Sequence, residues 1–454
     1  MKIIIVGAGK IGKILIENLV RKNHDITIID VDKNQIRSIQ NKFDLKTING
    51  FGSHPKILRS AQAQECDILI ATTNSDEINI IICQISSILF KIPTCIAKIK
   101  SNKYIQESKN LFRKKSIPID FLIIPKKILS KSIYKIIKYP GLLRVVEFAK
   151  KKISFVSVDI CKKSIFLGKR IKELYQYFSI NFFLFAILRK NRIFYPKEET
   201  KIYLKDEIFC ILDTKNLKKF VKQIKNRVYK RIMIFGGNSI GIELIKYLKN
   251  NYIIKLIEKN FKRADNLAKK LQNVTILFGK YSDRNLMKEE NIKQVDLFIS
   301  ITKNDEENII SAILAKKMGA KSNLAMITKV SYINIIKEID KIDYFFSKKL
   351  EIFSSFLKYK YKKQYSINNL TLLQYKNDKK VIEIIVKKNK NFSKMIGIKI
   401  NTIKFSTNFF IIAIVKKEKV YIYRESIEIL IEDGDRIIFF LEKEEELFSM
   451  IKNL

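Results

Sequence analysis

Apolar positions in the first 30 residues follow two different spacings. Lys2–Val6 is a short run of mostly β-branched apolar residues, which is typical of a buried parallel strand. From Ile11 to Val20, apolar residues recur at helical spacing instead. A second apolar run, Ile26–Ile29, then ends at Asp30. The pattern predicts a strand, a helix and a second strand in close succession.

A glycine-rich turn joins the first strand to the helix. It is Gly7-Ala8-Gly9-Lys10-Ile11-Gly12, a G-x-G-x-x-G motif in the strand–turn–helix setting typical of dinucleotide binding. Gly7 allows a tight turn, Gly9 lets the backbone approach a pyrophosphate, and Gly12 allows close packing of helix on strand. The N–H groups and dipole of the helix start favour phosphates. Taken alone, the motif leaves open a glycine turn with only a packing role.

Asp30 supplies the carboxylate expected of such a unit. It lies 18 residues past Gly12, at the end of the second strand, where it can accept hydrogen bonds from the hydroxyls of an adenosine ribose. A carboxylate at this place would also repel a 2′-phosphate. The sequence therefore favours NAD(H) over NADP(H).

Alternating strands and helices continue as far as Ile124. Further strands are expected at Leu45–Asn49, Asp67–Thr72, Cys95–Ile99 and Ile119–Ile124. Asn74-Ser75-Asp76 is a good N-terminal cap for a long helix that runs through Phe90. The alternation predicts a doubly wound parallel sheet that binds its ligand at the carboxyl ends of the strands. The residues that reach this edge are Thr72, Thr73, Asn74 and Lys98.

The chain repeats itself at a fixed offset of 229 residues. Gly7 recurs as Gly236, and Asp30 recurs as Glu258, one residue out of register. The same offset joins Gly50 to Gly279, Asp67 to Asp296, Asp76 to Asp305, Asn79 to Asn308, Gly168 to Gly397 and Asp206 to Asp435. A repeat of about 225 residues with two dissimilar parts indicates the duplication of a domain pair.

The second part of each repeat has a different pattern. A lysine-rich amphipathic helix, Lys126–Lys138, comes first, and its apolar stripe either packs on its own domain or belongs to a crossover helix exchanged with a neighbour. Short apolar strands follow in a small α+β pattern. The expected domains are 1–123, 143–225, 230–348 and 368–453. The predicted fold class is α/β, with two Rossmann-like doubly wound parallel-sheet domains, each followed by a small α+β domain.

Composition adds a net charge of +43 to this picture. The basic residues are mostly lysine and are spread along the whole chain, as A+T-rich coding DNA would produce, which argues against a nucleic-acid-binding patch. Attraction to an anionic membrane surface or an acidic partner stays open. The longest apolar stretch, Ile78–Phe90, is too short and too polar to span a bilayer. With a strand at the N-terminus in place of a signal peptide, we expect a soluble cytoplasmic protein.

Cysteines and histidines do not form a pattern typical of metal or redox chemistry. The five cysteines include no C-x-x-C pair, and the two histidines, His24 and His54, lie far apart. The simpler interpretation is that the three cysteines within apolar strand or helix patterns are small core residues, and an odd number of cysteines fits a reducing compartment.

Several segments together carry a family resemblance. They are MKIIIVGAGKIG, GFGSHPKILRSA, ATTNSDEINIIICQ, IDFLIIP, YPGLL, and RIMIFGGNSIG at the start of the second half. Over essentially its full length the chain resembles the TrkA family, the peripheral cytoplasmic subunits of bacterial Trk potassium uptake systems. In that family the tandem domains are the N-terminal and C-terminal parts of RCK domains (regulators of potassium conductance).

The resemblance implies two nucleotide sites. The first would use Gly7, Ala8, Gly9, Lys10 and Ile11 at the phosphates, Asp30 at the ribose, and Thr73, Asn74 and Lys98 to complete the pocket. The second would use Gly236, Gly237, Asn238, Ser239 and Ile240, with Glu258 at the ribose.

Asn238 is a departure from the family pattern, because it replaces the middle glycine of the second motif. Asparagine tolerates a left-handed backbone better than most residues, so the turn itself can survive. Its side chain would either block the phosphates or donate a hydrogen bond to them. We therefore expect the second site to be weaker or differently selective.

The resemblance further implies a regulator that senses NAD(H), with ATP and ADP as further candidate ligands. It would gate an integral-membrane potassium-translocating subunit from the cytoplasmic side of the cell inner membrane. It would be peripheral and would form a homo-oligomeric ring of RCK domains, with four chains. No catalytic residue, metal ligand or nucleic-acid partner is implied.

The alternative is an NAD-dependent oxidoreductase, which needs a proton donor or acceptor beside the nicotinamide. His24 precedes the second strand and is expected away from the ligand edge, and the second-repeat counterpart of His54 is Asp283. No acid/base residue is therefore duplicated. A nucleic-acid-binding redox sensor would need a DNA-reading helix pair, and the sequence has no such pattern.

Overall fold

The computed structural model describes the whole chain except residues 21–23, 114–115, 163, 191, 225–227, 281, 330, 333–334, 337–340, 366, 368, 373–378, 389–391, 401–408, 423–428 and 442–454. The chain divides into two compact units. The first comprises Met1–Ile128 and Glu351–Tyr359, and the second comprises Leu129–Leu350 and Lys360–Leu454.

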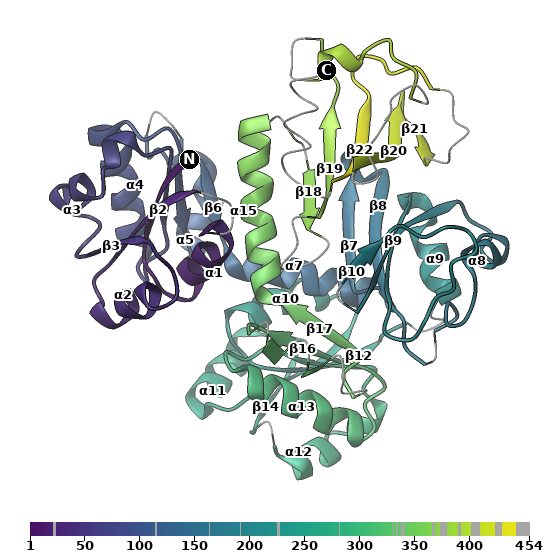
Figure 1. The fold of residues 1–454 in the computed structure, drawn as a ribbon. Coiled ribbons are helices and arrows are strands. Elements are labelled where there is room, and N and C mark those ends of the chain that lie inside the picture. The colour runs from purple at the N-terminus through teal and green to yellow at the C-terminus, as the bar shows by residue number, and fades with distance from the viewer. Residues whose placement is uncertain are drawn as a thin grey trace. The chain divides into compact units, whose positions relative to one another are not determined.

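The first unit is built on a six-stranded parallel sheet (Figure 1, purple to blue). Its strands are β1 (Lys2–Val6), β2 (Asp25–Asp30), β3 (Lys46–Asn49), β4 (Ile68–Ala71), β5 (Cys95–Lys98) and β6 (Phe121–Ile123). Its helices are α1 (Lys10–Leu19), α2 (Lys33–Gln40), α3 (Pro55–Ser60), α4 (Asp76–Phe90), α5 (Asn102–Gln106) and α6 (Ser108–Leu111). The strand order β3-β2-β1-β4-β5-β6 confirms the doubly wound sheet predicted from the alternating pattern.

A second sheet of the same kind begins at Arg231. Its strands are β12 (Arg231–Phe235), β13 (Ile253–Glu258), β14 (Thr275–Phe278), β15 (Leu297–Ser300), β16 (Asn323–Ile327) and β17 (Tyr344–Ser347). Its helices include α10 (Ser239–Leu248), α11 (Phe261–Lys270), α12 (Arg284–Glu289) and α13 (Asp305–Lys317). The strand order β14-β13-β12-β15-β16-β17 repeats that of the first sheet, which confirms the duplication.

Each parallel sheet is followed by a five-stranded antiparallel sheet. The first contains β7 (Arg144–Phe148), β8 (Ile153–Asp159), β9 (Phe182–Arg189), β10 (Arg192–Phe194) and β11 (Glu207–Asp213), with helices α8 (Ile171–Tyr177) and α9 (Leu217–Ile224). The second contains β18 (Asn369–Leu372), β19 (Lys380–Ile385), β20 (Phe409–Lys416), β21 (Lys419–Ile422) and β22 (Arg436–Leu441).

The two antiparallel sheets share one apolar core. Phe155, Phe185 and Phe209 from the first sheet lie in the same buried cluster as Ile438 and Phe440 from the second. Burial of these large side chains removes apolar surface from water, which is the main source of stability at such a contact. The duplicated small domains therefore pack on each other within one chain.

Two long helices connect the parallel-sheet parts to the antiparallel ones. In α7 (Pro125–Lys138), the part from Leu129 onward belongs to the second unit, where Tyr134 stacks on Tyr247 with ring centroids 5.4 Å apart. In α15 (Lys348–Tyr365), Glu351–Tyr359 belongs to the first unit, where Tyr359 stacks on Phe121 at 4.7 Å. Part of each helix therefore packs with a domain other than the parallel-sheet domain that precedes it, which supports the crossover alternative.

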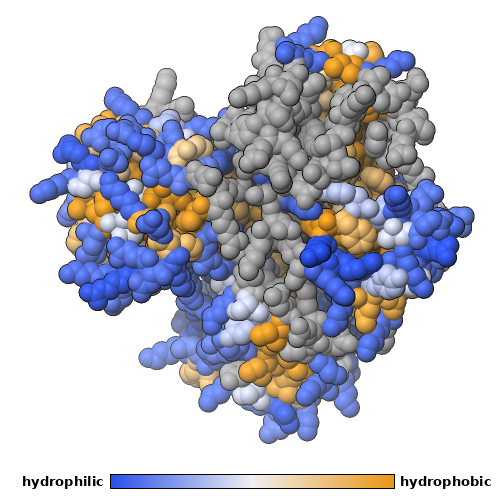
Figure 2. Space-filling view, viewed as in Figure 1, coloured by the Kyte–Doolittle hydropathy of each residue, from blue (hydrophilic) through white to orange (hydrophobic). Residues whose placement is uncertain are grey.

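Hydrophilic residues cover most of the described surface seen in Figure 2 and occur on every domain in view. Among the helices that the described residues form, none combines the length and the apolar character needed to cross a membrane.

Candidate nucleotide-binding sites

The glycine turn of the first domain lies between β1 and α1. Gly7 has φ +101°, and a Cβ atom there would lie 2.7 Å from the backbone nitrogen of Thr73. A Cβ atom at Gly12 would clash with the carbonyl oxygen of Gly7. Both glycines are therefore required by the chain itself. Gly9 is different, because its φ is −68° and a Cβ atom there would meet nothing within 4 Å.

The open space beside Gly9 lies at the start of a helix that has no side-chain cap. Gly9 is the N-cap residue of α1, and no side chain forms a capping hydrogen bond there. The first N–H groups of a helix have no partners within the helix, and the helix dipole favours an anion beside them. The combination can accept a phosphate group without displacing a side chain.

Asp30 ends β2 and faces the glycine turn. Its Oδ2 accepts a hydrogen bond from the backbone N–H of Ala8 at 2.5 Å, and its Oδ1 accepts one from Asp32 at 2.8 Å. These contacts hold the carboxylate beside the turn. The structure thus brings Asp30 together with the residues predicted to contact the phosphates.

The remaining predicted residues of the first site lie at the ends of β4 and β5. Thr73 donates hydrogen bonds from its backbone N–H and its hydroxyl to Oδ1 of Asn79, at 2.9 and 2.8 Å. Lys98 is buried, and its ammonium donates to the carbonyl of Thr72 at 2.8 Å. Asn74 is exposed, and its carbonyl accepts from Lys100 at 2.7 Å. These residues share the carboxyl edge of the sheet with Gly7 and Asp30.

The second domain has the same turn with a different start to its helix. Asn238 is the N-cap residue of α10, and its Oδ1 accepts from the backbone N–H groups of Ile240 at 2.8 Å and Gly241 at 3.2 Å. Its Nδ2 donates to the carbonyl of Ile301, at the end of β15. The backbone of Asn238 has φ −80°, so left-handed tolerance is not what permits asparagine here. Its side chain already bonds two N–H groups of the helix start.

Glu258 matches Asp30 in position and in contacts. It ends β13 and is buried, and its Oε2 accepts from the backbone N–H of Gly237 at 3.0 Å. Its Oε1 accepts from the backbone N–H of Asn260, also at 3.0 Å. A Cβ atom at Gly237 would lie 2.8 Å from that Oε2, so this glycine allows the carboxylate to approach the turn.

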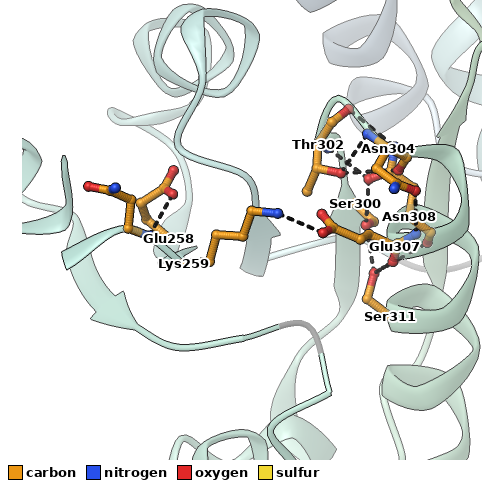
Figure 3. A network of polar contacts seen from close by, with 9 residues as sticks. Glu258, Lys259, Ser300, Thr302, Asn304, Glu307, Asn308 and Ser311 are labelled. Carbon is orange, nitrogen blue, oxygen red and sulfur yellow. Dashed lines mark hydrogen bonds and ion pairs between the residues drawn. The ribbon is translucent and has the colours of Figure 1, made fainter.

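Lys259 forms a further contact at the second site. Its ammonium lies 2.6 Å from Oε1 of Glu307, which is the third residue of α13 (Figure 3). The equivalent positions in the first domain are Val31, directly after β2, and Ile78, the third residue of α4. Both are apolar and exposed, so this ion pair has no counterpart there.

A repeated asparagine, to which no motif in the sequence assigns a role, organises the strand ends in both domains. Asn308 accepts from the backbone N–H of Thr302 at 2.7 Å and donates to the carbonyl of Met326 at 2.9 Å (Figure 3). Asn79 likewise accepts from Thr73 and donates to the carbonyl of Lys98 at 2.9 Å. The fixed offset between the two asparagines was the signal that could have revealed this function.

Carboxylates near the start of α4 and α13 have lowered pKa values. The hydroxyl of Tyr332 donates a hydrogen bond to Glu306, and this bond is the main cause that lowers the pKa of Glu306 to about 2. In the first domain the pKa of Glu77 is lowered by its own backbone N–H and by the hydroxyls of Ser75 and Tyr104. Both helix starts therefore stay negatively charged at neutral pH.

Comparison with known proteins places the chain among close relatives. The sequence pattern of the TrkA-N domain matches it twice, over residues 3–125 and 232–347. The "Trk system potassium uptake protein TrkA" of Vibrio alginolyticus is 38% identical over 444 residues, which cover 97% of this chain and 96% of that protein. The protein of the same name from Haemophilus influenzae is 36% identical over the same shares.

Solved structures show the same fold at low identity. The structure described as "Crystal Structure of the GsuK RCK domain" has a TM-score of 0.65 and 16% identity, and covers 100% of this chain and 95% of that chain. The structure described as "GsuK channel bound to NAD" has a TM-score of 0.64 and 15% identity, with 100% of this chain and 79% of that chain covered. These similarities confirm the RCK-type fold.

Proposed function

The chain belongs to the TrkA family of Trk system potassium uptake proteins, and on this basis we propose that it is the nucleotide-sensing regulatory subunit of a Trk-type potassium uptake system. In this proposal it binds NAD(H) and gates an integral-membrane potassium-translocating subunit. It acts as a peripheral protein on the cytoplasmic side of the cell inner membrane.

The open first site is the observation that carries the proposal. Gly9 leaves room beside an uncapped helix start, and the Asp30 carboxylate is held next to the same turn, within reach of a ribose. The similar GsuK structures, described as bound to NAD and to ADP, support a nucleotide as the ligand. The site residues are those assigned from the sequence: Gly7, Ala8, Gly9, Lys10, Ile11, Asp30, Thr73, Asn74 and Lys98.

Gating requires that the ligand distinguishes between two conformations. A ligand shifts such an equilibrium only by the difference between its affinities for the two states. The crossover helices α7 and α15 are suitable to transmit the shift, because each connects a parallel-sheet domain to elements packed elsewhere.

Assembly into a ring of four chains is part of the proposal. Helix α4 carries apolar side chains on its exposed face, including Ile81, Ile88 and Leu89, with exposed fractions of 48%, 56% and 56%. An exposed apolar stripe of this kind is typical of a protein interface. Light scattering of the wild type and of Leu89→Asp should show loss of the oligomer in the variant, and a monomeric wild type would contradict the ring.

The oxidoreductase alternative receives little support from the described residues. His54 is the N-cap residue of α3 and is exposed, with its ring 5.3 Å from that of Phe51. Its counterpart Asp283 caps α12 by accepting from Leu286. The duplicated feature is thus a helix start rather than a proton donor.

Potassium uptake in cells that lack their own peripheral Trk subunit tests the proposal. The chain should restore uptake, copurify with the membrane subunit, and detach from membranes as salt rises. Asp30→Ala should keep the copurification and change the response to NADH. Retention in membranes without the potassium subunit at high salt would contradict indirect attachment.

A further inference from the structure

Two side-chain contacts cross the carboxyl edge of the second parallel sheet. Strand β12 lies between β13 and β15 in that sheet. Lys259 follows β13 and Glu307 lies on the helix after β15, so their ion pair spans the end of β12, where the glycine turn begins (Figure 3). Asn238 makes the shorter connection, from the turn to the carbonyl of Ile301 after β15. In doubly wound folds, this reversal of strand order is where the ligand enters.

Neither contact can form in the first domain. Gly9 has no side chain where the second domain has Asn238, and its surroundings are open. Val31 and Ile78 replace Lys259 and Glu307, with exposed fractions of 54% and 40%. The two domains share a strand order and a pair of turn-facing carboxylates, but the Lys259–Glu307 ion pair and the Asn238 contact occur only in the second.

The ion pair is incompletely satisfied at its acidic end. The Glu307 side chain is 15% exposed and the Lys259 side chain 53%. Oε1 of Glu307 accepts from Lys259, while Oε2 is buried and has no hydrogen-bond partner among the described residues. A buried carboxylate oxygen without a partner favours any rearrangement that returns it to water. The Lys259 side chain is about half exposed, so its ammonium can exchange one anion for another.

We propose that the Lys259–Glu307 ion pair closes the second nucleotide fold, and that a ligand enters it only by replacing the Glu307 carboxylate with an anionic group of its own at the Lys259 ammonium. This inference rests on the proposed function, since it treats the second domain as a nucleotide site. Asn238 already occupies two N–H groups of the helix start, so a phosphate there needs a cation, and the Lys259 ammonium already holds an anion across the turn. The expected ligand class is a phosphate-bearing nucleotide that binds more weakly than at the first site.

Calorimetric titration of the full chain with NADH tests the closure. Glu307→Gln keeps the size of the side chain and removes its charge. The NADH affinity of the weaker class of sites, which we assign to the second domain, should therefore rise about tenfold. The affinity of the stronger class, in the first domain, should stay unchanged. Ile78→Gln, the equivalent change in the first domain, should leave the weaker class as in the wild type. If Glu307→Gln leaves the weaker class unchanged, the proposal is overturned.

A double variant tests the function of Lys259 separately. Lys259→Met combined with Glu307→Gln should lose the gain of the single variant, because the cation proposed to bind the phosphate is then absent. A gain that survives in the double variant would overturn Lys259 as a ligand. Circular dichroism of each variant checks that the fold is intact.

Inorganic pyrophosphate separates failure of this inference from failure of the proposed function. If the wild-type chain binds no NADH at either site, the proposal that it senses this nucleotide is wrong. The closure is then judged by pyrophosphate alone, which should bind Glu307→Gln more tightly than the wild type. Equal pyrophosphate binding by both chains would overturn the closure.

Discussion

The two parallel-sheet domains have the same strand order and differ at the edge where a ligand binds. In the first, Gly9 leaves the start of α1 uncapped, and Val31 and Ile78 are exposed apolar residues. In the second, Asn238 caps α10 and Lys259 pairs with Glu307. The helix start of the first domain is therefore open to an anionic ligand. In the second domain, side chains of the chain itself bond the helix start and pair the nearby lysine.

What the duplication kept identical is the scaffold. Asp76 accepts from the backbone N–H groups of Lys100 and Ser101, and Asp305 does the same for Thr328 and Lys329. These carboxylates tie a helix start to the next strand end in both domains. Asp76 and Asp305 are thus identical residues at the 229 offset that support the fold, whereas Gly9 and Asn238, also 229 apart, differ where a ligand is expected.

The largest expected effect comes from Asp30→Ala in the open site. The carboxylate is expected to bond the ribose and now holds the N–H of Ala8, so its loss removes both contacts. Hydrogen bonds to a charged group contribute about 1.5–3 kcal/mol, which corresponds to roughly a 10- to 100-fold loss of NADH affinity. Calorimetric titration with NADH measures this loss.

Asp32→Ala is the matched control for this change. Asp32 is also acidic and lies two residues away, but it caps α2 by accepting from Asn34. Its loss should lower the stability of that helix and leave NADH binding nearly unchanged. Unchanged NADH titration in Asp30→Ala, with the fold intact by circular dichroism, would contradict the assignment of Asp30.

A reciprocal exchange at the middle glycine should give an intermediate effect. Asn238→Gly frees two N–H groups of α10, and Gly9→Asn places the same cap on α1, where the backbone has room for a side chain. A tenfold change needs only about 1.4 kcal/mol, which is within the range of one N-cap interaction. We expect Asn238→Gly to tighten only the weaker class of NADH sites.

The reverse change should weaken only the stronger class of sites. With both changes in one chain, the two classes should become more alike in affinity. Two equal classes in the wild type, or no response to either change, would show that the cap does not determine the difference between the domains.

Much of the fold follows from short-range pattern. Strand β1 has the predicted bounds, Lys2–Val6, because a β-branched apolar run that ends at a glycine turn leaves little ambiguity. Ser75 caps α4 as its sequence context predicted, by accepting from Ile78. The side-chain cap by Asn238 was likewise readable, since asparagine is a preferred N-cap residue.

Contacts between distant segments were not predictable from that pattern. Lys259 and Glu307 are 48 residues apart, and neither belongs to a motif. The apolar stripe of α7 showed that the helix packs, but not on which surface: its Tyr134 stacks on Tyr247, 113 positions along the chain. Periodicity identifies a buried face, whereas its partner depends on the tertiary arrangement.

The smallest expected effect is at Lys98. Among the residues assigned to the first site, it is the buried cation at the strand ends. Its ammonium donates to the carbonyl of Thr72, and the equivalent residue in the second domain is the buried Ile327. Lys98→Ile therefore places at β5 a side chain that the same fold already accommodates at β16. We expect folding stability to change by no more than about 1 kcal/mol, because the hydrogen bond to Thr72 is exchanged for apolar burial.

NADH affinity of this variant should fall by only about threefold, since the charge acts on the phosphates from a distance rather than through a contact. Salt distinguishes the two cases, because screening weakens a long-range attraction more than a hydrogen-bonded pair. Titration at low and high salt should therefore show the difference between wild type and Lys98→Ile shrinking as salt rises. A hundredfold loss of NADH affinity that persists at high salt would instead make Lys98 a direct ligand. The affinity of the first site would then depend on a buried cation as well as on its open helix start.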